Sequence, residues 1–163
     1  MAVVTLRPYA EPDLGLLRSL LGDAHAMRFI GGAESDEAIS ARHARYLAVE
    51  PAVDSLFVIE ADSRPVGWIG FWGVGDAVCE AGWHVLASEQ GRGLAGAALA
   101  QLIGLARANG SYRYLEAYPA PENLASNALC RRAGFVDLGL VDIEYPKGRM
   151  MKAAHWRLDL VVG

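Results

Sequence analysis

The stretch that decides the fold is residues 79–106, which read CEAGWHVLASEQGRGLAGAALAQLIGLA. Its first part, residues 79–86, contains the aromatic and β-branched side chains that suit a buried strand. After Gly93, leucine, isoleucine and alanine recur on one helical face, so the period of the pattern changes from two to about 3.6. Gly91 and Gly93 separate the two patterns and predict a sharp turn from the strand into the helix.

The glycine turn predicts an anion-binding site. Because Gly91 and Gly93 have no Cβ, the backbone can approach a ligand closely, and the free N–H groups of the first helical turn point outward. Helix starts of this kind bind phosphate well. Small residues at 95–98 let the helix lie close to the element that it covers. The sequence therefore predicts a ligand that carries phosphate.

One glycine signature in this turn is the dinucleotide fingerprint, Gly-x-Gly-x-x-Gly, at residues 91–96. A dinucleotide fold normally carries it in the first strand-helix unit and adds several parallel units, but only about 70 residues follow here. Glu116 lies at a tolerable distance for the acidic residue of such a site. A dinucleotide-dependent oxidoreductase is therefore one alternative. A nucleotide-triphosphate loop is disfavoured, because the Lys-Ser/Thr of that motif is missing.

Length and composition restrict the class of protein. A chain of 163 residues is expected to form one domain, residues 1–163. The net charge of −4, without a concentration of Lys and Arg, argues against nucleic acid as a partner. No apolar run approaches the roughly 20 residues of a membrane span, and the N-terminus lacks a signal-peptide layout. Cys79 and Cys130 lack the spacing of a metal site or disulfide framework, which favours a cytoplasmic protein.

The remaining hydrophobic periods and turn signals predict the other elements. The predicted strands cover residues 3–7, 56–60, 65–72, 79–86, 112–118, 135–145 and 150–160. The predicted helices cover residues 11–21, a segment from 36 that Pro51 stops, 94–109 and 123–133.

Two tryptophans and two histidines are open to two interpretations. Trp68 and Trp72 could form a core or the wall of a substrate site, and burial statistics favour the core. His25 and His43 could contact a substrate, but solvated positions on a loop and a surface helix are the favoured interpretation.

Several motifs, in the correct order, resemble the GCN5-related N-acetyltransferase (GNAT) family. Residues 90–95, Gln-x-x-Gly-x-Ala, fit the family pattern that binds the pyrophosphate of acetyl-coenzyme A. Residues 123–126, Asn-x-x-Ser, followed by Gly-Phe at 134–135, look like the segment that holds the pantetheine arm. Together with that Asn-x-x-Ser segment, residues 6–8, Leu-Arg-Pro, and 80–83, Glu-x-Gly-Trp, look most like the RimJ/RimL-type branch that acetylates ribosomal-protein N-termini.

The resemblance covers the whole chain and implies an α/β fold with one mixed, mostly antiparallel twisted sheet of about seven strands and about four helices. It implies an enzyme that moves the acetyl group of acetyl-coenzyme A to a primary amine, a protein N-terminus or a small amine, by direct transfer in a ternary complex. No metal is implied. The alternative within the same fold is a non-catalytic acyl-coenzyme A binding module. Family habit also suggests a homodimer through the last strand or a helix.

The resemblance assigns residues to acetyl-coenzyme A. The strand at 83–85 is expected to separate from its neighbour and leave the Val85 backbone N–H free to polarise the thioester carbonyl. Asn123 is expected to bind the pantetheine arm, or to serve only as a helix N-cap. The expected cofactor-binding residues are Trp83, His84, Val85, Gln90, Gly91, Arg92, Gly93, Leu94, Ala95, Asn123 and Ser126.

Acetyl transfer also needs a base with a pKa near neutrality. Glu144, in an Ile-Glu-Tyr setting that the ribosomal-protein branch shares, is the first candidate, and Glu80, on the strand that leads to the cofactor, is the second. Either could instead be a solvated surface carboxylate. His84 is the third candidate, for which a core or edge position is favoured. Many family members protonate the leaving thiolate with a tyrosine where this chain has Cys130, which is expected to be inert. Ser126, one helical turn earlier, is expected to hydrogen-bond the thiolate.

The acceptor is not specified by the sequence. The loop at 25–35 and the hairpin around Pro146 are expected to line its pocket, because loops set such specificity. The negative net charge mildly favours a cationic acceptor.

Overall fold

The computed structural model describes residues 1–49 and 55–161, in which one seven-stranded sheet has the order β1-β2-β3-β4-β5-β7-β6. The strands are β1 (Val4–Pro8), β2 (Ser55–Ala61), β3 (Arg64–Gly75), β4 (Val78–Val85), β5 (Tyr114–Ala117), β6 (Val136–Glu144) and β7 (Met150–Asp159). The helices are α1 (Leu14–Leu21), α2 (Asp36–Leu47), α3 (Leu94–Asn109) and α4 (Leu124–Arg132), with short 3-10 turns at Glu11–Asp13 and Ala87–Glu89.

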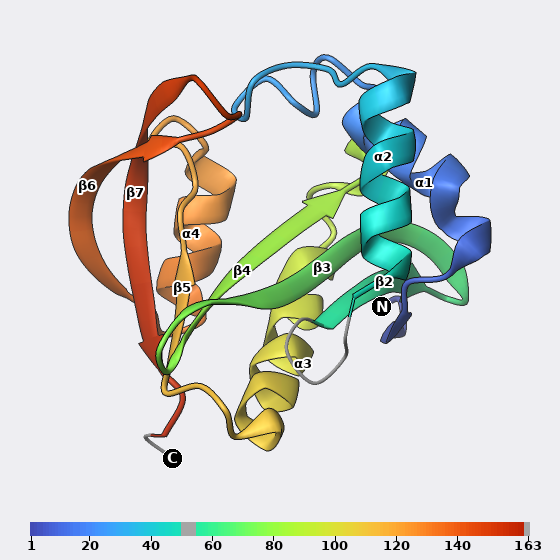
Figure 1. Cartoon of the computed structure of the whole chain (residues 1–163). Coiled ribbons are helices and arrows are strands. Elements are labelled where there is room, and N and C mark those ends of the chain that lie inside the picture. The colour runs from blue at the N-terminus through green and yellow to red at the C-terminus, as the bar shows by residue number, and fades with distance from the viewer. Residues whose placement is uncertain (50–54, 162–163) are drawn as a thin grey trace.

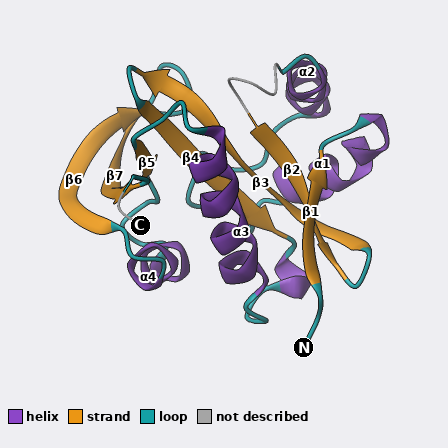
Figure 2. Cartoon of the chain, turned by 90° about the horizontal axis from the view of Figure 1, so that it is seen from below, coloured by secondary structure: helices purple, strands orange, loops and turns teal. Residues whose placement is uncertain are grey.

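The helices lie on both faces of the sheet (Figure 1, Figure 2). On β4, Cys79, Ala81 and Val85 are buried in the same core cluster as Leu99 and Leu102 of α3, as the alternation of strand side chains requires. A second cluster joins α1 and α2 through side chains such as Leu17, Leu20 and Ile39. The expected α/β fold is confirmed: among the described strand pairs, only β4 and β5 run parallel.

Strands β4 and β5 stay together over a short distance. They pair from Val78–Glu80 to Tyr114–Glu116, whereas β4 continues beside β3 as far as Val85. Figure 1 shows the two strands meeting at one end and separating toward the other. Among the described strands, the edge of β4 that faces β5 is therefore unpaired along the second half of the strand, which leaves a gap in the sheet.

Several element boundaries differ by a few residues from the sequence-based expectations: β3 continues to Gly75 rather than residue 72, and β5 covers Tyr114–Ala117 rather than 112–118. Helix α2 ends at Leu47, before Pro51, which lies outside the described residues. The last strand, β7, is paired with β5 on one side and β6 on the other, so the free edges of the sheet are β1 and β6. The last strand therefore offers no free edge to a second copy, and homodimerisation through the last strand or a helix stays a prediction. Within the described residues, no helix is both long and apolar enough to span a membrane.

Candidate active site

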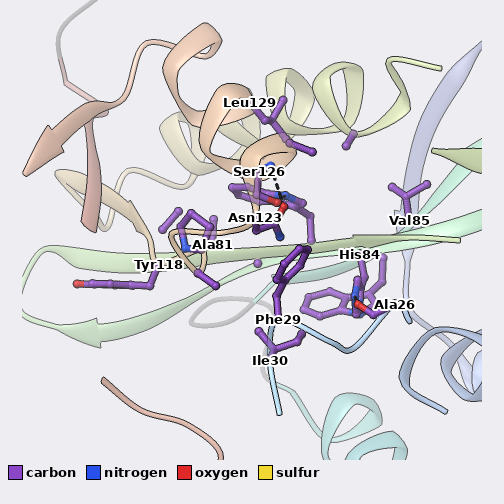
Figure 3. Close-up of a pocket in the computed structure, with 18 of the residues that line it drawn as sticks. Ala26, Phe29, Ile30, Ala81, His84, Val85, Tyr118, Asn123, Ser126 and Leu129 are labelled. Carbon is purple, nitrogen blue, oxygen red and sulfur yellow. Dashed lines mark hydrogen bonds between the residues drawn. The ribbon is translucent and has the colours of Figure 1, made fainter. Parts of the chain in front are cut away.

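A cavity of about 690 Å³ lies where β4 and β5 separate. Its lining includes β4 residues 80–85, the glycine turn at 89–96, side chains of 117–132 after β5, the loop at 26–30 and the hairpin at 143–151. In Figure 3, β4 runs through the middle, with Asn123, Ser126 and Leu129 on one side and Phe29 and Ile30 on the other. The cavity therefore connects the two faces of the sheet.

The glycine turn has the conformation that its sequence predicts. Gly91 and Gly93 have φ angles of 76° and 75°, in the left-handed region where L side chains are strained. A Cβ added at either position would meet no atom within 4 Å, so the space above the turn is open. Gly93 is the N-cap of α3, and Leu94 and Ala95 of the first turn line the cavity. The turn therefore presents a helix N-terminus to the cavity, as a phosphate site requires.

The backbone of β4 directs polar groups into the same space. The Leu86 N–H donates to the Val66 carbonyl over 2.8 Å, and hydrogen bonding alternates along an antiparallel pair. The even-numbered residues of β4 therefore bond to β3, and the N–H groups of Trp83 and Val85 point to the side where β5 has separated. The Gln90 Nε2 donates to the Val85 carbonyl over 3.2 Å and fixes the turn against the strand.

Helix α4 is tied to β4 across the cavity. The Asn123 Oδ1 accepts a hydrogen bond from the Ser126 backbone N–H over 3.1 Å, which makes Asn123 the N-cap of α4 (Figure 3). The Ser126 Oγ accepts one from the Trp83 Nε1 over 3.2 Å. The capping role of Asn123 is confirmed, and its contact with a pantetheine arm stays a prediction.

Two neighbouring carboxylates have opposite pKa shifts. Burial, followed by the charge of Glu116, raises the pKa of Glu80, which lines the cavity, to about 7. Burial alone would also raise the pKa of Glu116, but hydrogen bonds from Tyr118, Arg157 and His155 lower it below its usual value. The Arg157 Nε and the His155 Nε2 lie 2.7 Å and 3.0 Å from its Oε1. Glu116 therefore stays ionised while Glu80 is poised near neutrality.

Residues 4–136 match the family model described as the acetyltransferase (GNAT) domain. The chain belongs to the GNAT family. This membership decides between the two glycine signatures: the turn of this GNAT domain carries the acetyltransferase pattern, and the dinucleotide interpretation is wrong. A search of curated proteins found no match.

Solved structures share the fold of this GNAT domain at low sequence identity. The RimL ribosomal-protein alpha-N-acetyltransferase in complex with coenzyme A is 19% identical, with a TM-score of 0.81 over 96% of this chain and 93% of that chain. The aminoglycoside acetyltransferase AAC(6')-Ib with coenzyme A is 22% identical, with a TM-score of 0.78 over 96% and 93%. A GNAT acetyltransferase from Bacillus anthracis is 16% identical, with a TM-score of 0.82 over 98% and 99%.

Most of the site residues expected from the sequence line the cavity of this GNAT domain. Of the expected cofactor-binding residues, Arg92 alone does not; its guanidinium pairs with Glu89 within the turn. Of the two candidate carboxylates, Glu80 lines the cavity. Glu144 is exposed, and its Oε1 accepts a hydrogen bond from the Gly148 backbone N–H over 2.7 Å. Its neighbours Ile143 and Tyr145 line the cavity, but Glu144 is not among the described lining residues.

The histidines and the cysteine at the usual tyrosine position have structural surroundings. The His84 Nε2 lies 3.2 Å from the Ala26 carbonyl, and burial lowers the pKa of the ring, so a neutral imidazole holds the loop. His25 is exposed, as expected, but the expectation for His43 is wrong: it is buried, with its Nδ1 2.6 Å from the Tyr9 hydroxyl. Burial raises the pKa of Cys130 to about 12, which supports an inert thiol.

Several aromatic lining residues were not assigned to the site from the sequence. The preference for a core position is wrong for Trp72, which is half-buried and lines the cavity, and Trp68 both lines the cavity and packs against the α1–α2 cluster. Phe29, Tyr46 and Tyr118 also line it. Of these residues, only Phe29 lies in the loop that the sequence named for the acceptor pocket, so its place in that loop was an available signal; the others lie on β3, on α2 and after β5.

Proposed function

We propose that residues 1–163 form a single N-acetyltransferase domain that transfers the acetyl group of acetyl-coenzyme A to a primary amine by direct attack in a ternary complex. The observation that carries this proposal is the cavity that joins the glycine turn at the start of α3 to Glu80 through the separation of β4 and β5. Direct transfer requires both substrates in one continuous space, and this cavity supplies it.

The residues around the cavity fit acetyl-coenzyme A. The open positions above Gly91 and Gly93 leave room for a pyrophosphate at the N-terminus of α3. The outward N–H group of Trp83 and the side chain of Asn123, the N-cap of α4, line the same cavity and would hold the pantetheine arm. The bound coenzyme supplies an acetyl thioester for attack by the amine. The Val85 N–H would then stabilise the oxyanion, a contribution of a few kcal/mol for a preorganised donor.

The base in this proposal is Glu80, with Glu144 as the competing candidate. A carboxylate with a pKa of about 7 is half ionised at neutral pH and accepts the proton of an ammonium more readily than an ordinary carboxylate, directly or through water. Glu80 also lies inside the cavity, whereas Glu144 is held by the hairpin turn.

Ser126 is proposed to stabilise the leaving sulfur. Its Oγ already accepts from the Trp83 Nε1, which leaves the hydroxyl proton available to point at a thiolate. Trp83 therefore acts as a positioning residue for Ser126. Cys130, which is completely buried, would take no part.

We also propose a cytoplasmic location and homodimerisation. The two cysteines are free and buried, which suits a reducing compartment. On the edge strand β6, Val136, Leu138 and Leu140 are exposed apolar residues that a second copy could cover. Light scattering on the purified protein would measure its mass and so decide the oligomeric state.

The first experiment is a thermal melt with coenzyme A, acetyl-coenzyme A and NAD in turn, because a ligand that binds only the folded state raises the melting temperature. We expect both coenzyme A forms to raise it and NAD to leave it unchanged. Release of free thiol in the presence of an amine then tests for an enzyme. Coenzyme A binding without turnover of any amine would instead support the non-catalytic binding module.

A further inference from the structure

A row of cross-strand pairs crosses β3 and β4 on the face opposite α3. Trp68 pairs with His84, Gly70 with Gly82, and Trp72 with Glu80. Side chains of directly opposed residues share a face of the sheet. The intervening Ile69, Phe71, Ala81 and Val85 belong to the core beneath α3, so the row faces the other way, toward the loop at 26–30 and α2.

Gly82 allows the two indole rings of this row to converge. A Cβ at Gly82 would lie 2.8 Å from the Cη2 of Trp72 and 3.3 Å from the Cη2 of Trp68. Both rings therefore lie over the glycine, and Trp72 is the cross-strand neighbour of Glu80. Tyr46 of α2 extends this surface, with its ring centroid 5.9 Å from that of Trp68. The Trp68 Nε1 is buried and has no hydrogen-bond partner among the described residues.

The loop and the hairpin close over this aromatic surface. The Arg42 guanidinium of α2 lies 3.5 Å from the Tyr145 hydroxyl of the hairpin. A Cβ at Gly31 would lie 3.0 Å from the Cδ of Pro146, so the loop and the hairpin touch. Figure 1 shows the segment between α1 and α2 meeting the tip of the β6–β7 hairpin. Phe29 and Ile30 of the same loop line the enclosed space.

The charges in this space suit one ammonium group. Among the described lining residues the carboxylates are Glu80 and Glu89, and Glu89 lies in the glycine turn, paired with Arg92 and Arg64. The lining guanidinium groups are those of Arg28, Arg42 and Arg132, and that of Arg42 is paired with Glu34. Indole faces attract a cation and also stack on flat apolar groups. A polycation would place its further charges beside arginines, whereas a single ammonium beside Glu80 avoids that repulsion.

Building on the proposed acetyltransferase function, we propose that the acceptor is a primary monoamine with an aromatic body close to the amine. Its ammonium group contacts Glu80, and its ring lies on Trp72 and Trp68. In the transfer, the ammonium proton passes to Glu80, the neutral amine nitrogen bonds to the acetyl carbon, and the carbon–sulfur bond breaks with its electron pair on sulfur. The second proton that the nitrogen loses as the amide forms goes to the thiolate, which leaves as the thiol.

The test compares kcat/KM for 2-phenylethylamine, n-butylamine and spermidine with acetyl-coenzyme A, measured by thiol release. We expect 2-phenylethylamine to exceed n-butylamine and spermidine by about tenfold, since ring stacking and apolar burial together supply that discrimination. Trp72→Leu and Gly82→Ala should each lose most of this preference, the latter because its Cβ displaces both indoles. Trp72→Phe should retain part of it. A preference for spermidine or n-butylamine, or an unchanged preference in Trp72→Leu, overturns the proposal.

The matched control is Tyr114→Leu, which removes a half-buried aromatic residue of β5 that is not among the described lining residues. It should keep the substrate preference of the wild type, and the melting temperature of each variant verifies folding. Failure of this proposal and failure of the acetyltransferase function give different results. Acetylation of spermidine without any preference for the aromatic amine contradicts only the acceptor class. No stabilisation by coenzyme A and no thiol release with any amine contradicts the function itself.

Discussion

Glu80 on β4 and Glu116 on β5 lie side by side at the last position that the two parallel strands share before they separate. The same place in the sheet therefore opens the cavity and sets the ionisation of the proposed base. Because Tyr118, Arg157 and His155 keep Glu116 ionised, its charge adds to burial in opposing the ionisation of Glu80.

The first prediction concerns the pH dependence of acetyl transfer. The raised pKa of Glu80, about 7, means that the carboxyl holds its proton below that pH and cannot accept another. The kcat/KM should therefore rise as the pH increases through about 7 and level off above it. Glu80→Gln should reduce kcat/KM by about a hundredfold or more and abolish this rise with pH.

Glu144→Gln is the comparison that separates the two candidate bases. Its carboxylate is exposed and bonded to the Gly148 N–H, so the change should alter kcat/KM by no more than about twofold. A large loss in Glu144→Gln with little loss in Glu80→Gln would transfer the role to Glu144.

The second prediction isolates the charge of Glu116. Glu116→Gln removes the negative charge beside Glu80 but keeps an oxygen that can accept from Arg157 and His155. The pKa of Glu80 should fall, and the midpoint of the rise in kcat/KM with pH should move to lower pH. The measurement is the same pH profile, with the melting temperature as a check on folding. An unmoved midpoint would mean that burial alone sets the pKa of Glu80.

The order of the elements could be predicted from the sequence because the signals are local. The change of hydrophobic period at Gly93 marks the start of α3, and the left-handed φ angles of Gly91, Gly93 and Gly110 are a property of the glycines themselves. The residues of the turn and of the α4 cap were found for the same reason. Each belongs to a motif that fits within a few residues of chain.

The rest of the site depends on strand register and on contacts between distant segments. Trp72 turns toward the cavity because Gly82, on the neighbouring strand, leaves room for its ring. His43 is buried because Tyr9 lies against it. The low pKa of Glu116 depends on β7, which the chain inserts between β5 and β6. The sequence around either residue of such a pair contains no pattern that predicts which distant residue it will contact.

The third prediction concerns the phosphate site. Gly93→Ala places a side chain at a φ of 75°, which costs about 1–2 kcal/mol and lowers the melting temperature by about 2–8 °C. It should also abolish the rise in melting temperature with coenzyme A, because relief of that strain turns the first N–H groups of α3 away and the new methyl group enters the open space.

Gly110→Ala is the matched control, since Gly110 caps the other end of α3 with a φ of 73°. It should cost a similar loss of stability and keep the full effect of coenzyme A. If both variants respond equally to coenzyme A, the turn at Gly93 is not the phosphate site.

The fourth prediction is that Ser126 and Trp83 act as a unit on the leaving sulfur. Ser126→Ala removes the proposed hydrogen bond to the thiolate and should lower kcat by about tenfold to a hundredfold, the value of a hydrogen bond to a charged group. Trp83→Phe removes the donor that holds the Ser126 Oγ at 3.2 Å and should lower kcat by less. Because Trp83 is proposed to act through Ser126, the double variant should be no slower than Ser126→Ala alone. The kcat of the three variants with saturating acetyl-coenzyme A checks this. Losses that multiply would show that the indole acts independently of the serine.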